Sequence, residues 1–139
     1  HISIYNIIVK VIDQYIKEIE KDLAVDQFNI KDVSMKTPSR KHFWVSKLIN
    51  HKRTIINLKA ERYELKKKIV EDIRTKSPVK VTIPVAEKTA WNHPDMLDVQ
   101  RRIDEQELIV EFLEKTEKTF SSLSFDIKNI IEIIKMETL

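Results

Sequence analysis

The absence of glycine constrains this chain more than any other feature, because all 139 residues must fold without it. Glycine allows positive φ and a close backbone approach to a ligand, and phosphate-binding loops and dinucleotide-binding folds depend on both. We therefore expect neither an ATPase nor a Rossmann-type enzyme. Proline is also scarce, and none interrupts the sequence between Pro38 and Pro78. Long uninterrupted helices are the expected outcome.

The composition narrows the class of protein further. The chain has no cysteine, which excludes disulfides, thiol catalysis and cysteine metal sites and is typical of a reducing cytoplasm. Apolar residues make up 42% of the sequence and charged residues 34%, as in helix-rich soluble proteins. No apolar run is long enough to cross a membrane. We expect a cytoplasmic protein with no membrane partner.

Helical spacing of apolar residues predicts the first elements. A stripe with steps of three or four predicts an amphipathic helix over about residues 2–24. This period is lost over residues 25–36, which we interpret as a linker. Thr37 then fits a helix cap and Pro38 a first helical position, so a long helix is predicted over about residues 38–74. The apolar seam of the long helix consists of Trp44, Leu48, Ile55, Leu58, Leu65 and Ile69.

The remaining prolines mark a loop and the start of a last helix. Residues 75–93 are expected to form a loop, in which "VKVTI" alternates like a short strand. A C-terminal helix is predicted over about residues 94–136, with Asn92 or His93 as its cap. Serines within residues 121–124 are expected to bend this helix or to split it in two.

These elements predict a mainly α-helical fold in which residues 1–139 form a single elongated domain. A helix over residues 38–74 is about 55 Å long at about 1.5 Å per residue. A compact chain of this size has a radius of gyration of only about 14 Å. The long helix must therefore pair in a helical hairpin or a coiled-coil-like arrangement and bury its remaining apolar surface against other subunits. We predict a homo-oligomer, with an elongated monomeric hairpin as the alternative.

Charge is distributed very unevenly along the sequence. Residues 36–80 hold 14 Lys and Arg against 4 Asp and Glu, a balance of +10. The segments on either side, residues 1–35 and 81–139, have balances of −2 and −5. Clustered positive charge on one element is the electrostatic pattern of nucleic-acid binding, because phosphate neutralisation releases counterions. A solvated or partner-facing basic surface is the alternative interpretation.

The basic segment contains the candidate binding residues. Its most concentrated part, "RYELKKKIVEDIRTKSPVK", runs into the proline-marked loop and includes Lys80. The candidate DNA-binding residues are Lys59, Arg62, Lys66, Lys67, Lys68, Arg74 and Lys76. Aromatic residues among such cations suit a single strand, whose bases and phosphates both need partners. The aromatic candidates are Phe43, Trp44, Tyr63 and Trp91, of which we select Tyr63 and Trp44, and a core position is the alternative for each.

Nothing in the sequence predicts catalysis or a metal site. His42 and His51 are nine residues apart, which places them on opposite sides of one helix. No His–Glu pair has the spacing of metal ligands. The carboxylates Asp104, Glu105 and Glu107 are expected to form a solvated helix face. We therefore expect neither an enzyme nor a bound cofactor.

Three segments resemble the UvsY family of phage recombination mediators. "EKDLAVDQFNIKDVSMKTPSRKHFWVSKL" is similar to the N-terminal region of that family, and "FLEKTEKTFSSLSFDIKNIIEIIKMETL" is similar to its C-terminal helix. "ELKKKI" resembles its basic strand-binding stretch, of the form Leu-Lys-Ala-Arg-Leu, and places Lys66 and Lys68 at the two basic positions. The family stretch continues into tyrosines and glycine, whereas this chain continues as "VEDIRTKSP".

The resemblance implies a function in phage DNA recombination, repair and replication, without catalysis. It implies a ring-like homo-oligomer, a hexamer or heptamer, that binds single-stranded DNA already coated by the phage single-strand-binding protein. Such a protein helps the RecA-like recombinase of the phage to load onto that DNA in the infected host cell. The alternative is a coiled-coil structural or assembly adaptor, for example in virion assembly, with no nucleic-acid role.

Overall fold

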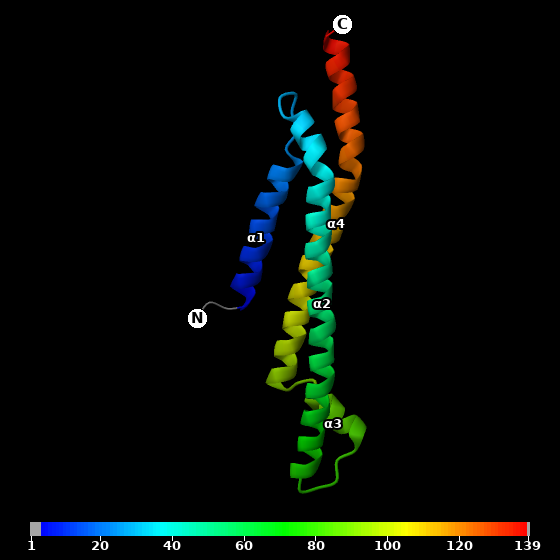
Figure 1. Cartoon of the computed structure of the whole chain (residues 1–139). Coiled ribbons are helices and arrows are strands. Elements are labelled where there is room, and N and C mark those ends of the chain that lie inside the picture. Colours follow the sequence, from blue (N-terminus) through cyan, green and yellow to red (C-terminus); the bar gives the residue numbers. More distant parts are fainter. Residues whose placement is uncertain (1–3, 139) are drawn as a thin grey trace. The chain divides into compact units, whose positions relative to one another are not determined.

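The computed structural model describes residues 4–138, which form four α-helices and no strand (Figure 1). The helices are α1 (Ile4–Leu23), α2 (Ile30–Lys76), α3 (Ile83–Ala90) and α4 (Pro94–Thr138). The predicted mainly α-helical class is confirmed, and residues 2 and 3 of the predicted first helix lie outside the described residues. None of the helices in this part of the chain combines the length and apolar character of a membrane span.

The helices pack as two compact units. Unit 1 comprises the chain up to Asn50 and from Ile109 onward, and unit 2 comprises His51–Leu108. The single elongated domain remains a prediction.

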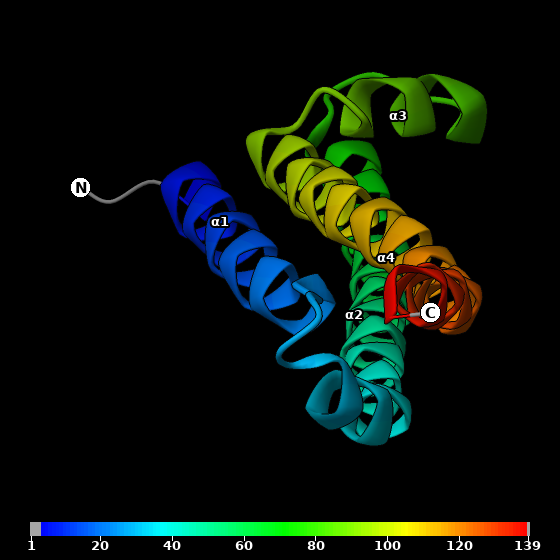
Figure 2. The same ribbon diagram turned by 90° about the horizontal axis from the view of Figure 1, so that it is seen from above.

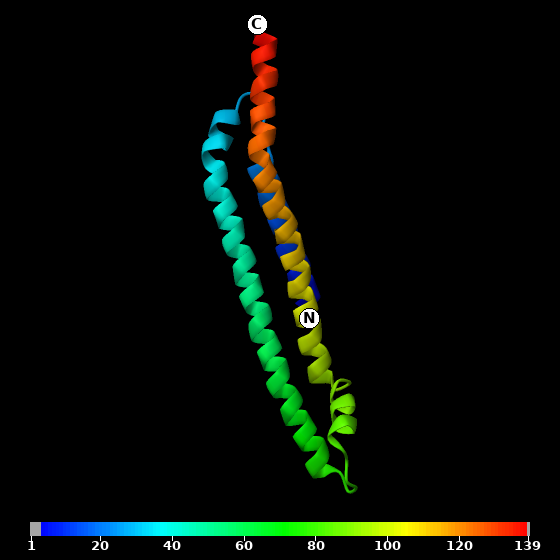
Figure 3. The same ribbon diagram turned by 90° about the vertical axis from the view of Figure 1, so that its right-hand side faces the viewer.

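Unit 1 is built around a core that α1, α2 and α4 share. Within it, α1 packs on one side of the pair formed by α2 and α4 (Figures 1 and 2). The apolar stripe of α1 lies on this core, with Ile19 buried and Tyr15 packed against it. Trp44 and Phe120 are its largest fully buried side chains. The last turns of α4 extend past the start of α2 (Figure 3), and Ile133 and Met136 are exposed there.

The helix α2 begins earlier than the sequence predicts. Its start is defined by Asp26 and Asn29: Oδ1 of Asp26 accepts from the Asn29 N–H at 2.9 Å, and Oδ1 of Asn29 accepts from the Asp26 N–H at 2.7 Å. This reciprocal pair has the hydrogen bonds of a capping box, and it satisfies amides of the turn that leads into Ile30, the first residue of α2. The helix then includes most of the predicted linker, and Pro38 lies inside it. Thr37 is not a cap, because its hydroxyl donates to the Val33 carbonyl one turn back, at 2.6 Å.

In unit 2, the short helix α3 replaces much of the predicted loop, and the predicted strand does not form among the described residues. Val79 to Thr82 lie in the loop that precedes α3, and a lone strand there has no partner to pair with. Pro84 occupies a first-turn position of α3, which suits its fixed φ and missing N–H. Ala90 of α3 packs in a small core with Ile69 of α2 and Met96 of α4. Figure 3 shows α3 beside the C-terminal end of α2.

The helix α4 begins at a cap that the sequence indicated and continues without a break. Nδ1 of His93 accepts from the Asp95 N–H at 3.1 Å, and the His93 carbonyl accepts from the Leu97 N–H at 3.0 Å. The expected split at residues 121–124 does not occur, because α4 runs through them as one helix, in which Ser122 donates its hydroxyl to the Thr119 carbonyl at 3.0 Å. The expected carboxylate face is also only partly correct, since Asp104 and Glu107 are exposed but Glu105 is buried.

Candidate nucleic-acid interface

The predicted cationic residues all lie on the part of α2 that belongs to unit 2. Arg62 and Lys66 are half-buried, whereas the other five are exposed. Two of the exposed residues form surface ion pairs: Lys59 Nζ lies 3.9 Å from Glu107 Oε1, and Lys76 Nζ lies 2.9 Å from Asp72 Oδ1. Exposed pairs of this kind are worth only about 0–1 kcal/mol, so a phosphate can compete for these lysines.

The most concentrated positive charge surrounds a groove, which we call the basic groove. It has a volume of about 430 Å³ and is lined by Lys66, Lys67, Val70, Glu71, Arg74, Thr75, Lys80, Val81, Ile83 and Glu87. Four of these residues are cationic and two are anionic, so the lining carries a positive balance. Its apolar side chains come from both α2 and the segment opposite. The groove therefore offers an anionic ligand both ionic and apolar contacts.

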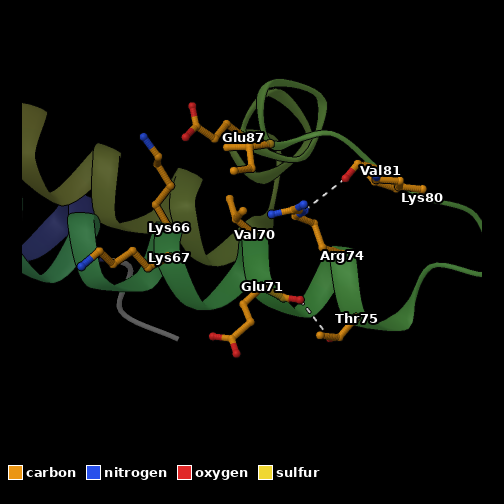
Figure 4. A pocket seen from close by; sticks show the side chains of 10 residues that line it. Lys66, Lys67, Val70, Glu71, Arg74, Thr75, Lys80, Val81 and Glu87 are labelled. Atoms are coloured by element: carbon orange, nitrogen blue, oxygen red, sulfur yellow. Dashed lines mark hydrogen bonds between the residues drawn. The ribbon is translucent and has the colours of Figure 1, made fainter.

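Two walls form the basic groove. One wall is α2, on which Lys66, Val70 and Arg74 are four residues apart and therefore share a face. The other wall is the segment from Lys80 to Glu87, and Figure 4 shows Glu87 facing the side of α2 that bears Val70. The walls are tied together where Nε of Arg74 donates to the Val81 carbonyl at 3.1 Å (Figure 4).

Not every candidate cation belongs to the groove. Lys68 is the second basic position of "ELKKKI", the stretch that resembles the strand-binding segment of the UvsY family. It lines a different, small pocket with Glu61, Glu64 and Leu65. Lys59 and Lys76 are also outside the groove lining. The structure thus brings Lys66, Lys67 and Arg74 together around one cavity and separates the other candidates from it.

The aromatic candidates divide into buried and exposed residues. Trp44 is only 1% exposed and lies in the core of unit 1, so a nucleobase cannot stack on it. Phe43 is half-buried against the same core. Tyr63 is 57% exposed, with the Lys67 ammonium 4.6 Å from its ring centroid. Trp91, which was not selected from the sequence, is exposed in unit 2. The tryptophan that is accessible for stacking is therefore Trp91 rather than Trp44.

The second wall of the basic groove was not foreseen from the sequence. Val81, Ile83 and Glu87 lie in the segment that was interpreted as a loop with a short strand. A local signal for α3 was present, since Pro84 is a typical first-turn residue and Ala86 and Ala90 are one turn apart. Within residues 4–138, no group of three or more His, Cys, Asp or Glu side chains is placed to hold a metal ion.

Comparison with solved structures identifies the fold. No protein-family model matches the sequence, and neither does any curated protein. A crystal structure of the bacteriophage T4 recombination mediator protein UvsY, of lattice type IV, matches with a TM-score of 0.76 and covers 90% of this chain and 97% of its own. The chain has the UvsY fold. A second UvsY crystal structure, of lattice type II, matches with a TM-score of 0.75 over 91% of this chain and 97% of its own.

The likeness to UvsY is structural rather than a likeness of sequence. The identities to the two UvsY structures are 16% and 15%. The three sequence segments predicted a likeness to the UvsY family. The structural matches confirm this likeness for the fold, over most of both chains. A shared fold does not by itself transfer a function, so the function has to be argued from the residues of this chain.

Proposed function

We propose that this chain is a recombination mediator, an oligomeric single-stranded-DNA-binding protein that helps to load a phage RecA-like recombinase onto DNA coated by single-strand-binding protein. The observation that carries the proposal is the position of "ELKKKI". This stretch, which resembles the strand-binding segment of the UvsY family, lies on α2 where Lys66 and Lys67 line the basic groove. The UvsY fold supports the same function, because the T4 protein of that fold is a recombination mediator.

A mediator of this kind needs no catalytic residues. It has to present several phosphate-binding sites together, so that avidity offsets the weakness of each single site. Apolar side chains on the surface of unit 1, including Met35, Phe125 and Met136, support self-association, since large exposed apolar side chains favour contact with other subunits. We propose a ring-like homo-oligomer, a hexamer or heptamer, whose partners are single-stranded DNA, the recombinase and the single-strand-binding protein.

One observation favours the alternative, a coiled-coil assembly adaptor. The ion pairs Lys59–Glu107 and Lys76–Asp72 place carboxylates beside two of the seven candidate cations. Carboxylates interspersed among lysines are typical of a solvated helix face, and they repel a phosphate backbone. The adaptor would share the helices and the self-association but would bind no oligonucleotide.

Salt-dependent binding separates the two functions. Fluorescence anisotropy with a labelled oligo(dT) should show affinity that falls with salt, with a log–log slope of about −0.7 for each neutralised phosphate. The double variant Lys66→Glu/Lys68→Glu should weaken binding and flatten that slope. The matched control Lys118→Glu/Lys128→Glu makes the same change in net charge at exposed sites of α4 in unit 1, and it should leave the slope nearly unchanged.

Light scattering complements the binding measurement. The mass of the purified chain should correspond to a closed oligomer, with and without oligonucleotide, and the double variant should keep that mass. A wild-type chain that binds no oligonucleotide even at low salt would exclude the mediator function and leave the adaptor. A compact monomer in solution would remove the avidity on which the proposal depends.

A further inference from the structure

The indole of Trp91 occupies a position that the proposed function leaves unexplained. Its side chain is 42% exposed, although the preceding residue, Ala90, is completely buried in the core of unit 2. Aromatic side chains dominate the energetics of cores and interfaces, so an exposed indole beside a core contact is a candidate for ligand contact. Trp91 is also the one tryptophan available for such a contact, because Trp44 is buried.

The backbone around Trp91 is held by hydrogen bonds. The Trp91 N–H donates to the Glu87 carbonyl at 3.2 Å, which closes the last turn of α3. The next two amides, those of Asn92 and His93, donate to the carbonyls of Thr89 and Ala90 at 3.1 and 3.0 Å. The turn therefore presents the indole from a defined position, and a contact made from an ordered backbone loses less entropy on binding.

Two cations of α2 flank the indole. The guanidinium carbon of Arg62 lies 5.7 Å from the centroid of the Trp91 ring, and the ammonium nitrogen of Lys66 lies 5.6 Å from it. Arg62 also donates from Nη1 to Oε1 of Gln100, which fixes its side chain. The exposed ring thus has two positive charges within cation–π distance. A nucleotide whose base stacks on the ring would have its phosphates near the charges of Arg62 and Lys66.

The indole and the basic groove share Lys66. This residue contacts the Trp91 ring and also lines the groove, together with Lys67, Arg74 and Lys80. An aromatic platform that continues into a cationic groove is the combination by which proteins bind single strands without reading their sequence.

We propose that Trp91 stacks on a nucleobase of single-stranded DNA, that Arg62 and Lys66 contact its phosphates, and that the strand continues into the basic groove. This inference rests on the proposed function and assigns the residues that carry it out. Tyr63 is the comparison residue. It is more exposed than Trp91, and like Trp91 it lies beside a lysine of the groove lining, with the Lys67 ammonium 4.6 Å from its ring centroid, whereas two cations, Arg62 and Lys66, lie beside the Trp91 ring.

Affinity and salt dependence together test the stacking contact. Trp91→Ala should weaken oligo(dT) binding about ten- to hundred-fold, the range for one stacked base. The salt slope should stay unchanged because no charge is removed. Trp91→Phe should retain most of the affinity. Tyr63→Ala should weaken binding less than Trp91→Ala does, and the control Val85→Ala, at an exposed position of α3, should have no effect.

Tryptophan fluorescence gives an independent readout. The chain contains two tryptophans, so in Trp91→Phe the tryptophan emission comes from the buried Trp44 alone. Oligo(dT) should quench the wild-type emission and leave that of Trp91→Phe unchanged. Undiminished quenching in Trp91→Phe, or wild-type affinity in a folded Trp91→Ala chain, would overturn the stacking assignment while oligonucleotide binding survives. Absence of binding by the wild type at low salt would instead overturn the proposed function itself.

Discussion

Nε1 of the Trp44 indole donates a hydrogen bond of 2.7 Å to Oδ2 of Asp22. The same oxygen accepts from Nε and Nη2 of Arg40, each at 2.9 Å. The Asp22 carboxylate near the end of α1 therefore satisfies two groups of α2, one of which belongs to the largest buried side chain of unit 1. A buried indole needs such an acceptor, because an unpaired N–H in the core is destabilising.

Removal of this acceptor should destabilise unit 1. Asp22→Ala leaves the indole N–H and the Arg40 guanidinium without their shared partner, and we expect a loss of about 1–3 kcal/mol in the free energy of unfolding. Urea unfolding monitored by circular dichroism measures this loss. The control Glu132→Ala removes an exposed carboxylate that lies 3.9 Å from Lys135, and it should change stability by less than about 0.5 kcal/mol. Equal stabilities for the two variants would contradict the role of Asp22.

The capping box at the start of α2 makes a second prediction. Asp26→Ala removes the oxygen that accepts from the amides of Phe28 and Asn29, at 2.7 and 2.9 Å. Loss of an N-terminal cap costs about 1 kcal/mol, and the first turn of α2 should become less protected from hydrogen exchange. Gln27→Ala, at the exposed position directly after Asp26, is the control. An unchanged exchange rate in the first turn of Asp26→Ala would show that α2 is anchored by other contacts.

The sequence correctly predicted the buried face of α2, because this face depends only on the local spacing of apolar residues. Trp44, Leu48 and Ile55 were placed on the inner face of α2 because their steps of four and seven follow the helical period, and all three are buried. The basic groove was only half predicted. Lys66 and Arg74 were candidates as members of a dense cluster, but the opposite wall depends on the packing of α3, which charge counting does not detect. The position of Trp91 likewise depends on tertiary structure.

The start of α2 was predicted eight residues late because proline is ambiguous in sequence. Pro38 fits a first helical position and also occurs, at a cost, inside a helix. The structure places it in the interior, where the Ser34 carbonyl loses the N–H of residue 38 as a partner. Pro38→Ala should therefore raise the free energy of unfolding, by about 1–3 kcal/mol. A helix that began at Pro38 would show no such gain, so thermal or urea unfolding of this variant decides between the two helix starts.

The buried carboxylate of Glu105 offers a stabilising substitution. Glu105 is only 9% exposed, its Oε2 has no hydrogen-bond partner among the residues that the structure describes, and its Oε1 lies 3.4 Å from Arg101 Nη1. A half-satisfied buried carboxylate is costly, and an apolar residue of similar size often replaces it with a gain in stability. Glu105→Leu should raise the free energy of unfolding by about 1 kcal/mol, measured from the urea midpoint. Glu107→Leu, at an exposed site of the same helix, should give no gain. A loss of stability in Glu105→Leu would mean that the single contact with Arg101 outweighs the desolvation of the carboxylate.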